Sequence, residues 1–127
     1  MSVRGYYAEI KKEQWREVAK YVNTNAHSRD MLLFNAYYCM EPFNYYSRSD
    51  LAKKGFPESD RTVDEKNINT LWKTVKHYDR VWVILSHSGD KKELITKTLM
   101  KSYRLSSQAE FKFIKIYLFE KGSGKTA

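Results

Sequence analysis

The chain has 127 residues, of which 42% are hydrophobic and 15% aromatic, with two prolines and five glycines. This length and composition fit one folded domain, exclude a disordered linker, and leave no uncharged apolar stretch near the roughly 18 to 20 residues of a membrane span. The net charge of +8 is concentrated in the second half, because residues 1–60 carry nine basic and eight acidic side chains and residues 61–127 carry fourteen and seven. We therefore expect a soluble domain over residues 1–121, a flexible tail over 122–127, and a surface suited to anionic partners.

The first half of the chain predicts a helix, a buried strand and a short second helix. Between Lys11 and Asn23, apolar residues recur at the spacing of one helical face, namely Trp15, Val18, Ala19 and Val22. Residues 31–36 are of strand length and begin with four consecutive apolar side chains, which indicates a strand covered on both faces. Pro42 suits the first turn of a helix that reaches about Ser49, and a short extra strand is expected near residues 54–57.

The second half predicts a further alternation of helices and strands. An amphipathic helix is expected over residues 63–77, and the β-branched run 81–85 predicts a second central strand. Asp90 or Ser88 can cap the next helix, with Leu94, Ile95, Leu99 and Tyr103 as its buried positions. Residues 111–119 predict a third strand. The alternation of strands with amphipathic helices predicts an α/β fold, a three-layer sandwich with a small, mainly parallel sheet and helices on both faces, Rossmann-like in arrangement.

Ligand contacts are expected where these strands end, since open α/β sheets bind ligands beyond the carboxyl ends of their strands. The residues that the topology selects are Asn35, Tyr37, Ser86 and His87. The first strand also leads into a cluster of aromatic residues: Tyr37, Tyr38, Phe43, Tyr45 and Tyr46. This cluster fits a small core that holds its own loop, or a surface for a partner or a membrane interface.

Several segments resemble catalytic, phosphate-binding or metal-binding motifs, but none of them has the spacing that such a site needs. Residues 122–126 resemble the end of a phosphate loop, yet Phe119 stands where that motif needs a glycine. Residues 86–90 contain serine, histidine and aspartate without a glycine-flanked nucleophile turn. The three histidines lack metal-ligand spacing, and one cysteine excludes an internal disulfide. We expect no catalytic residue, no metal and no cofactor, and we disfavour nucleic acid because the tyrosines and the excess positive charge lie in different halves.

Four segments, taken in order, resemble a known domain: residues 13–22 (Glu-Gln-Trp-Arg-Glu-Val-Ala-Lys-Tyr-Val), 30–36 (Asp-Met-Leu-Leu-Phe-Asn-Ala), 42–46 (Pro-Phe-Asn-Tyr-Tyr) and 80–87 (Arg-Val-Trp-Val-Ile-Leu-Ser-His). Their order resembles the C-terminal soluble domain of membrane glycosyltransferases of the dolichyl-phosphate-mannose protein mannosyltransferase type. The resemblance covers most of residues 6–121. It implies a multi-spanning parent protein that transfers a sugar from a polyprenyl-phosphate carrier, with this domain on the extracytoplasmic side of the membrane.

In that family the catalytic and lipid-phosphate contacts belong to the membrane-embedded part, so the resemblance implies that the isolated domain is inactive and has an accessory role. The implied partners are the membrane-embedded portion of the parent enzyme, a glycan or protein acceptor, and anionic lipid headgroups. Lys91, Lys92, Lys97 and Lys101 could face such headgroups, although a solvated helix face is the simpler explanation and the one we favour. Two alternatives stay open: a stand-alone basic binding module for nucleic acid or protein, and a small α/β enzyme.

Overall fold

The computed structural model describes residues 3–47 and 49–122, with side chains described from Gln14 onward. The helices are α1 (Val3–Asn25), α2 (Met40–Tyr46), α3 (Leu71–Val75) and α4 (Leu94–Leu99), with 3-10 turns η1 (Tyr37–Cys39) and η2 (Asn67–Thr70). The strands are β1 (Met31–Asn35), β2 (Ala52–Gly55), β3 (Arg80–Leu85), β4 (Tyr103–Phe111) and β5 (Ile114–Lys121). Apart from Gly122, the predicted tail and its phosphate-loop-like residues lie outside the described part of the chain.

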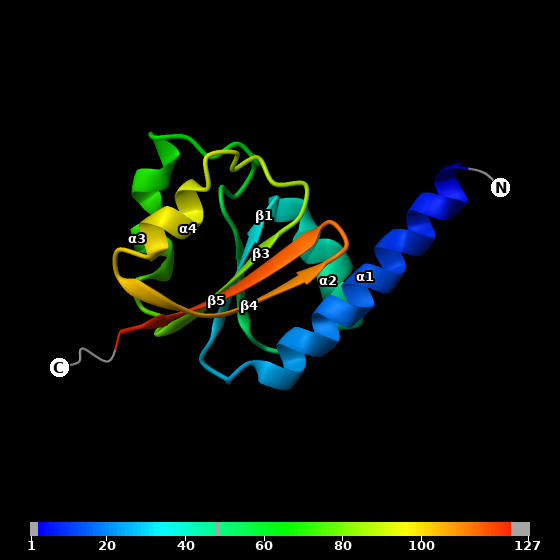
Figure 1. Ribbon diagram of the computed structural model, residues 1–127, viewed down its shortest axis with the longest axis horizontal. Coiled ribbons are helices and arrows are strands. Elements are labelled where there is room, and N and C mark those ends of the chain that lie inside the picture. Colours follow the sequence, from blue (N-terminus) through cyan, green and yellow to red (C-terminus); the bar gives the residue numbers. More distant parts are fainter. Residues whose placement is uncertain (1–2, 48, 123–127) are drawn as a thin grey trace.

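The five strands form one mixed sheet in the order β2-β1-β3-β5-β4 (Figure 1). β1 pairs in parallel with β2 and β3, whereas β5 is antiparallel to both β3 and β4. The predicted fold class, a mainly parallel Rossmann-like sandwich, was therefore wrong. The helix that was expected to include Tyr103 ends at Leu99, and the chain from Tyr103 onward forms an antiparallel hairpin.

Two local features conceal this hairpin in the sequence. The register of β4 shifts between Leu105 and Ser107, so that Leu105 packs into one core and Phe111 into the other. Such a bulge breaks the alternation that marks a strand. The turn consists of Lys112 and Phe113 and lacks the glycine, asparagine or aspartate typical of tight hairpins. The single strand predicted over 111–119 is in fact the end of β4, the turn and most of β5.

β1 and β3 run through the middle of the sheet and bury side chains on both of its faces. On one face Phe34 and Trp82 pack against α1 and α2, through Trp15, Val18, Ala19, Val22 and Phe43. On the other face Leu33 and Val83 pack against α3 and α4, through Leu71, Val75, Ile95 and Leu99. The apolar runs of both strands follow from this double cover, because neither face of either strand meets water.

The helical segment predicted over residues 63–77 is much shorter in the structure, where η2 and α3 span only 67–75. The Asp64 carboxylate accepts hydrogen bonds from the backbone N–H groups of Lys66 and Asn67 at 2.9 and 2.8 Å. The Asn67 side chain in turn accepts a bond from the Asp64 N–H at 2.9 Å. These bonds satisfy the backbone locally, so a turn replaces the first part of the expected helix.

Candidate functional site

The carboxyl ends of β1 and β3 lie side by side at one edge of the sheet, which we call the carboxyl edge. Asn35 at the end of β1 pairs with Leu85 at the end of β3. Beyond them the chain continues toward β2 on one side and toward β4 and β5 on the other. Connections diverge in this way at the ligand-binding points of open α/β sheets. All four residues predicted to contact a ligand are at or next to this edge: Asn35, Tyr37, Ser86 and His87.

Asn35 is buried and holds together two of the loops at the carboxyl edge. Its Nδ2 donates to the backbone oxygens of Phe56 at 2.8 Å and Arg61 at 2.9 Å. Its Oδ1 accepts from the Ser88 hydroxyl at 2.7 Å and from the Gly89 N–H at 3.0 Å. Two donated and two accepted bonds use the hydrogen-bonding capacity of a side-chain amide. The structure therefore assigns Asn35 to positioning the loops after β2 and β3, which leaves its amide no spare polar atom for a ligand.

Ser86 is also buried, and its backbone continues the pairing between the two strands. The Ser86 N–H donates to the Asn35 oxygen at 2.9 Å, and the Ser86 oxygen accepts from the Ala36 N–H at 3.0 Å. The thiol of Cys39 donates to the same Ser86 oxygen at 3.4 Å. Ser86 thus belongs to the structural frame of the edge.

Tyr37 and His87 lie closer to the surface. Tyr37 is half-buried, and its side chain packs so tightly on Gly55 that a Cβ there would lie 2.3 Å from the Tyr37 Cβ. His87 is exposed, has a left-handed φ of 52°, and places its ring 6.3 Å from that of Tyr38. Of the four predicted residues, His87 is the one whose side chain is most open to a ligand.

Asp90 occupies the place where an anion would bind in many α/β proteins. Its carboxylate accepts the N–H groups of Leu94 and Ile95 at the start of α4, both at 2.8 Å. Of the two residues predicted to cap this helix, Asp90 and Ser88, Asp90 accepts its first N–H groups, although the residue directly before the helix is Glu93. Because the chain's own carboxylate fills these amide positions, the start of α4 is not available to a ligand phosphate.

The polar residues after β3 do not assemble a hydrolytic relay. The Ser88 hydroxyl donates to Asn35, and the Asp90 carboxylate faces the start of α4. Within the described residues, no hydrogen bond joins the His87 imidazole to a serine or to a carboxylate. A nucleophile needs such a bond to an adjacent base.

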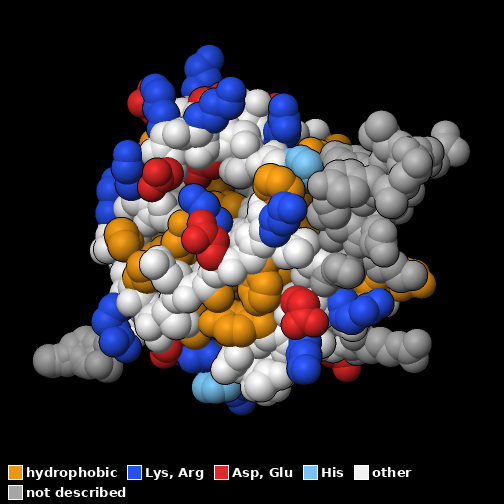
Figure 2. Space-filling model, turned by 45° about the vertical axis from the view of Figure 1, so that its right-hand side comes forward, with side chains coloured by type: hydrophobic (Ala, Val, Ile, Leu, Met, Phe, Trp, Pro, Cys, Tyr) orange, Lys and Arg blue, Asp and Glu red, His pale blue; other side chains and the backbone are white. Residues whose placement is uncertain are grey.

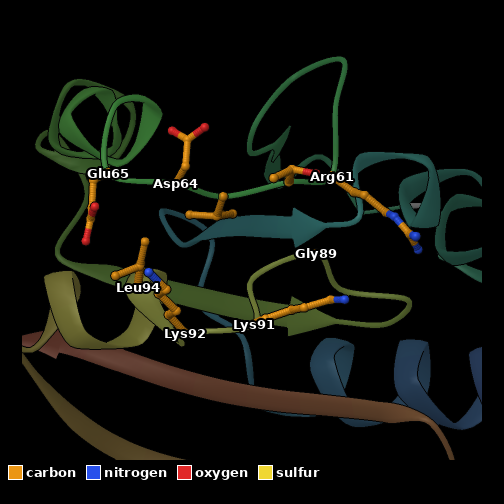
Figure 3. Close-up of a pocket in the computed structure, with 9 residues that line it drawn as sticks. Arg61, Asp64, Glu65, Gly89, Lys91, Lys92 and Leu94 are labelled. Atoms are coloured by element: carbon orange, nitrogen blue, oxygen red, sulfur yellow. The ribbon is translucent and has the colours of Figure 1, made fainter.

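A cleft of about 380 Å³ opens beside Gly89, between residues 61–65 and the loop that leads to α4 (Figure 3). Its lining combines apolar surface with acidic and basic side chains, from Arg61, Thr62, Val63, Asp64, Glu65, Gly89, Lys91, Lys92 and Leu94. In Figure 3 Glu65 and Lys92 reach toward each other from opposite walls, while the Asp64 carboxylate points away. Because basic and acidic side chains both line the cleft, it offers no cluster of one charge that would bind an ion of the opposite charge.

The sequence contained little to identify this cleft. Gly89 forms part of its floor, because a Cβ at this position would lie 2.4 Å from the Arg61 backbone oxygen. An isolated bridge between Thr62 and Gly89 brings the two loops together. The glycine between Ser88 and Asp90 was a visible signal for a close backbone approach, but Arg61 and Lys91 come from loops without a motif.

The most strongly shifted titratable group lies away from the carboxyl edge. Burial, reinforced by the nearby Asp79 carboxylate, raises the pKa of Tyr103 to about 12. The Tyr103 hydroxyl donates to the backbone oxygens of Val75 and Tyr78, both at 2.8 Å. Its position opposite Lys121 places it near the amino ends of the parallel strands. This tyrosine fastens α3 to β4 and has no catalytic partner in that arrangement.

The remaining chemistry of the described residues is sparse. Among residues 3–47 and 49–122, no group of three or more His, Cys, Asp or Glu side chains is placed to hold a metal ion. In the same part of the chain no helix is long and apolar enough to cross a bilayer. Figure 2 shows basic side chains spread over one face with acidic ones between them, around a central hydrophobic area. On that face the positive charge does not form the continuous stripe expected of a nucleic-acid surface.

The four lysines considered for headgroup contact lie before, within and after α4. Lys91 and Lys92 lie at the cleft near the carboxyl edge. Lys97 lies within α4, and Lys101 follows α4 shortly before β4 begins at the opposite edge. All four are exposed, and their contact with headgroups stays a prediction.

Comparisons with known proteins identify no relative: protein-family models, curated protein sequences and solved structures contain no significant match to this chain.

Proposed function

We propose that this chain is a non-catalytic accessory domain of a multi-spanning, polyprenyl-phosphate-sugar-dependent glycosyltransferase. In this proposal the domain lies on the extracytoplasmic side, packs beside the membrane-embedded enzyme and contacts its acceptor or glycan. The sugar transfer itself belongs to the membrane-embedded part.

The observation that carries the proposal is that the four segments of the resemblance fold into one structural unit. They correspond to the second half of α1, to β1, to α2 and to β3. Their large side chains meet in a single core, where Phe34 contacts Phe43 with ring centres 5.3 Å apart and Tyr21 contacts Trp82 at 6.0 Å.

The state of the carboxyl edge supports the accessory role. An enzyme site of this fold class needs a deep pocket, convergent free polar groups and a perturbed titratable residue. Here the polar side chains nearest the strand ends already bind parts of the chain itself. Asn35 and Ser88 bind the loops, and Asp90 binds the start of α4. The cleft beside them carries acidic and basic side chains together. These features favour binding or packing over chemistry, and they count against the alternative of a small α/β enzyme.

The decisive test is the coding region immediately upstream of Met1 in the source genome. We expect an in-frame array of hydrophobic spans of about 20 residues each. A natural start at Met1 without any membrane span would overturn the proposal and favour a stand-alone binding module.

A second test addresses the absence of catalysis. The isolated chain, incubated with a polyprenyl-phosphate sugar and an acceptor, should transfer no sugar above a protein-free control. The complete parent protein in detergent serves as the positive control. Transfer by the isolated chain would overturn the accessory role while leaving the family assignment intact.

A further inference from the structure

The turn between β4 and β5 presents an apolar ring to solvent at a position where the backbone disfavours it. Phe113 is 71% exposed. Its φ of 67° lies in the left-handed region, where a bulky residue without a special reason is rare. A glycine or asparagine would fit this turn position better. An outlier of this kind in a two-residue turn motivates a search for a function of the ring.

One lysine contacts this ring and two more lie in its neighbourhood. Lys112 lies beside Phe113 in the turn, with its Nζ 5.6 Å from the centre of the ring. Lys115, next on β5, is exposed, and Lys91 shares with Phe113 the lining of a second hollow of about 340 Å³. Asp90, Glu93 and Glu110 line the same hollow, and Glu110 pairs across the strands with Lys115, so Lys112 is the lysine of the tip without an acidic residue opposite it in the hairpin. An apolar ring flanked by lysines is the arrangement that suits the interface of an anionic membrane.

The turn lies at the carboxyl edge of the sheet, together with the end of β3. Lys115 pairs with Leu85, the last residue of β3, so residues 112–113 lie just beyond it. Tyr38, which is 44% exposed, follows β1 at the same edge and packs near His87. The edge thus offers aromatic side chains from two separate segments.

Helix α1 also extends beyond this edge. The Gln14 side chain accepts a hydrogen bond from the Lys112 N–H at 2.9 Å, which fixes the middle of α1 beside the turn. Because α1 runs antiparallel to β1, residues 3–13 continue past the turn, over roughly 16 Å at 1.5 Å per residue. Figure 1 shows this half of the helix projecting from the body on the side of the hairpin tip.

We infer that the carboxyl edge lies against an anionic phospholipid surface, with the Phe113 ring entering the interface and Lys112 and Lys115 facing the headgroups. The inference deepens the proposed function, since it states which side of an accessory domain would face the membrane. The Lys112 charge is complementary to anionic headgroups, and the exposed Phe113 ring would be buried at such an interface.

The test is co-sedimentation of the full chain with vesicles of equal parts phosphatidylglycerol and phosphatidylcholine, compared with phosphatidylcholine alone, at low salt. Phe113→Gly is the main variant because it relieves the left-handed φ; it should fold at least as stably as the wild type. We expect it to lower the partition coefficient onto anionic vesicles roughly tenfold. Lys112→Glu should lower it by about fivefold or more, since each basic residue near such a surface contributes about that factor.

Matched controls come from the opposite edge. Met100 is 54% exposed and Lys101 is exposed, and both lie just before β4 begins. Met100→Ser and Lys101→Glu should bind anionic vesicles as the wild type does. Wild-type chain that fails to bind anionic vesicles, or controls that lose as much binding as the tip variants, would overturn the inference.

The two proposals fail separately. Vesicle binding that depends on Phe113, found together with an upstream region that encodes no membrane span, would leave the inference standing and overturn the glycosyltransferase proposal. If the upstream region encodes membrane spans but the full chain does not bind vesicles, only the inference is overturned. The carboxyl edge would then be covered by a protein surface of the parent enzyme.

Discussion

Asp30 accepts a hydrogen bond from the indole nitrogen of Trp82 at 2.8 Å, although the two residues are 52 positions apart in the chain. The same carboxylate accepts the Arg80 Nε at 3.0 and 3.1 Å and the His27 N–H at 2.9 Å. Asp30 is only 2% exposed. A single buried carboxylate therefore connects the turn after α1 to the beginning of β3, and it compensates the cost of burying an indole N–H.

Replacing Asp30 by alanine should lower the free energy of unfolding by about 2 to 4 kcal/mol, because the Trp82 and His27 N–H groups lose their acceptor, while Arg80 keeps its ion pair with Glu120 at 3.2 Å. Urea denaturation followed by tryptophan fluorescence measures this directly. Asp79→Ala is the control, since that carboxylate is 90% exposed in its pair with Lys121 and should have little effect. Equal losses in the two variants would contradict the role assigned to Asp30.

Asn35→Asp tests the amide that joins the loops of the carboxyl edge. A carboxylate keeps the shape of the side chain but cannot donate to the Phe56 and Arg61 oxygens, and it would set negative charge against them. We expect a loss of about 2 to 4 kcal/mol in unfolding free energy. Asn69→Asp, which affects one exposed bond to the Glu65 oxygen, should change stability by no more than about 0.5 kcal/mol. A ligand-binding role without a structural one would instead leave the stability of Asn35→Asp unchanged.

Gly89→Ala should disturb the floor of the cleft. The added Cβ would lie 2.4 Å from the Arg61 oxygen and 3.0 Å from the Thr62 nitrogen, both of them backbone atoms that cannot rotate away. Such overpacking typically costs about 1 to 3 kcal/mol. Gly122→Ala has no atom within 4 Å of the new methyl group and serves as the matched control. Thermal unfolding of both variants is the measurement. Equal melting temperatures for Gly89→Ala and Gly122→Ala would contradict the close approach of Gly89 to the Arg61 backbone.

The central strands were predictable because burial on both faces leaves a direct trace in the sequence. Met31-Leu32-Leu33-Phe34 and Val81-Trp82-Val83-Ile84 are apolar without alternation, and the structure places them next to each other in the sheet. The direction of the last strands was not predictable in the same way. A register shift in β4 and a turn made of Lys112 and Phe113 removed both the alternation and the turn residues on which a hairpin is recognised.

The sequence predicted where the candidate residues lie in the fold, but it did not predict the contacts of their side chains. Strand ends selected Asn35, Ser86 and His87, and all three lie at the carboxyl edge. The Asn35 amide donates to the backbone oxygens of Phe56 and Arg61. These contacts depend on the conformation of long loops, and no periodic pattern or motif in the sequence predicts that conformation. Phe113 was read as strand interior, because its left-handed turn conformation is rare for an aromatic residue.

Tyr103 makes stability depend on pH in the alkaline range. Its pKa is raised to about 12 by burial and by Asp79, whereas a tyrosine in an unfolded chain titrates near 10. Between these values the unfolded state loses the proton and the folded state keeps it, so the contribution of Tyr103 is complete below about pH 10 and is lost as the pH rises through 12. Its full size is on the order of 2 kcal/mol.

Tyr103→Phe isolates this contribution from the other groups that titrate at high pH. The variant loses the bonds to the Val75 and Tyr78 oxygens, so near neutral pH it should be less stable than the wild type by about 1 to 2 kcal/mol. The difference between wild type and variant should shrink as the pH rises from 10 to 12, because only the wild type has this proton to lose on unfolding. Urea denaturation of both proteins at each pH measures it. A difference that stays constant over this range would show that the Tyr103 hydroxyl titrates alike in the folded and unfolded chains.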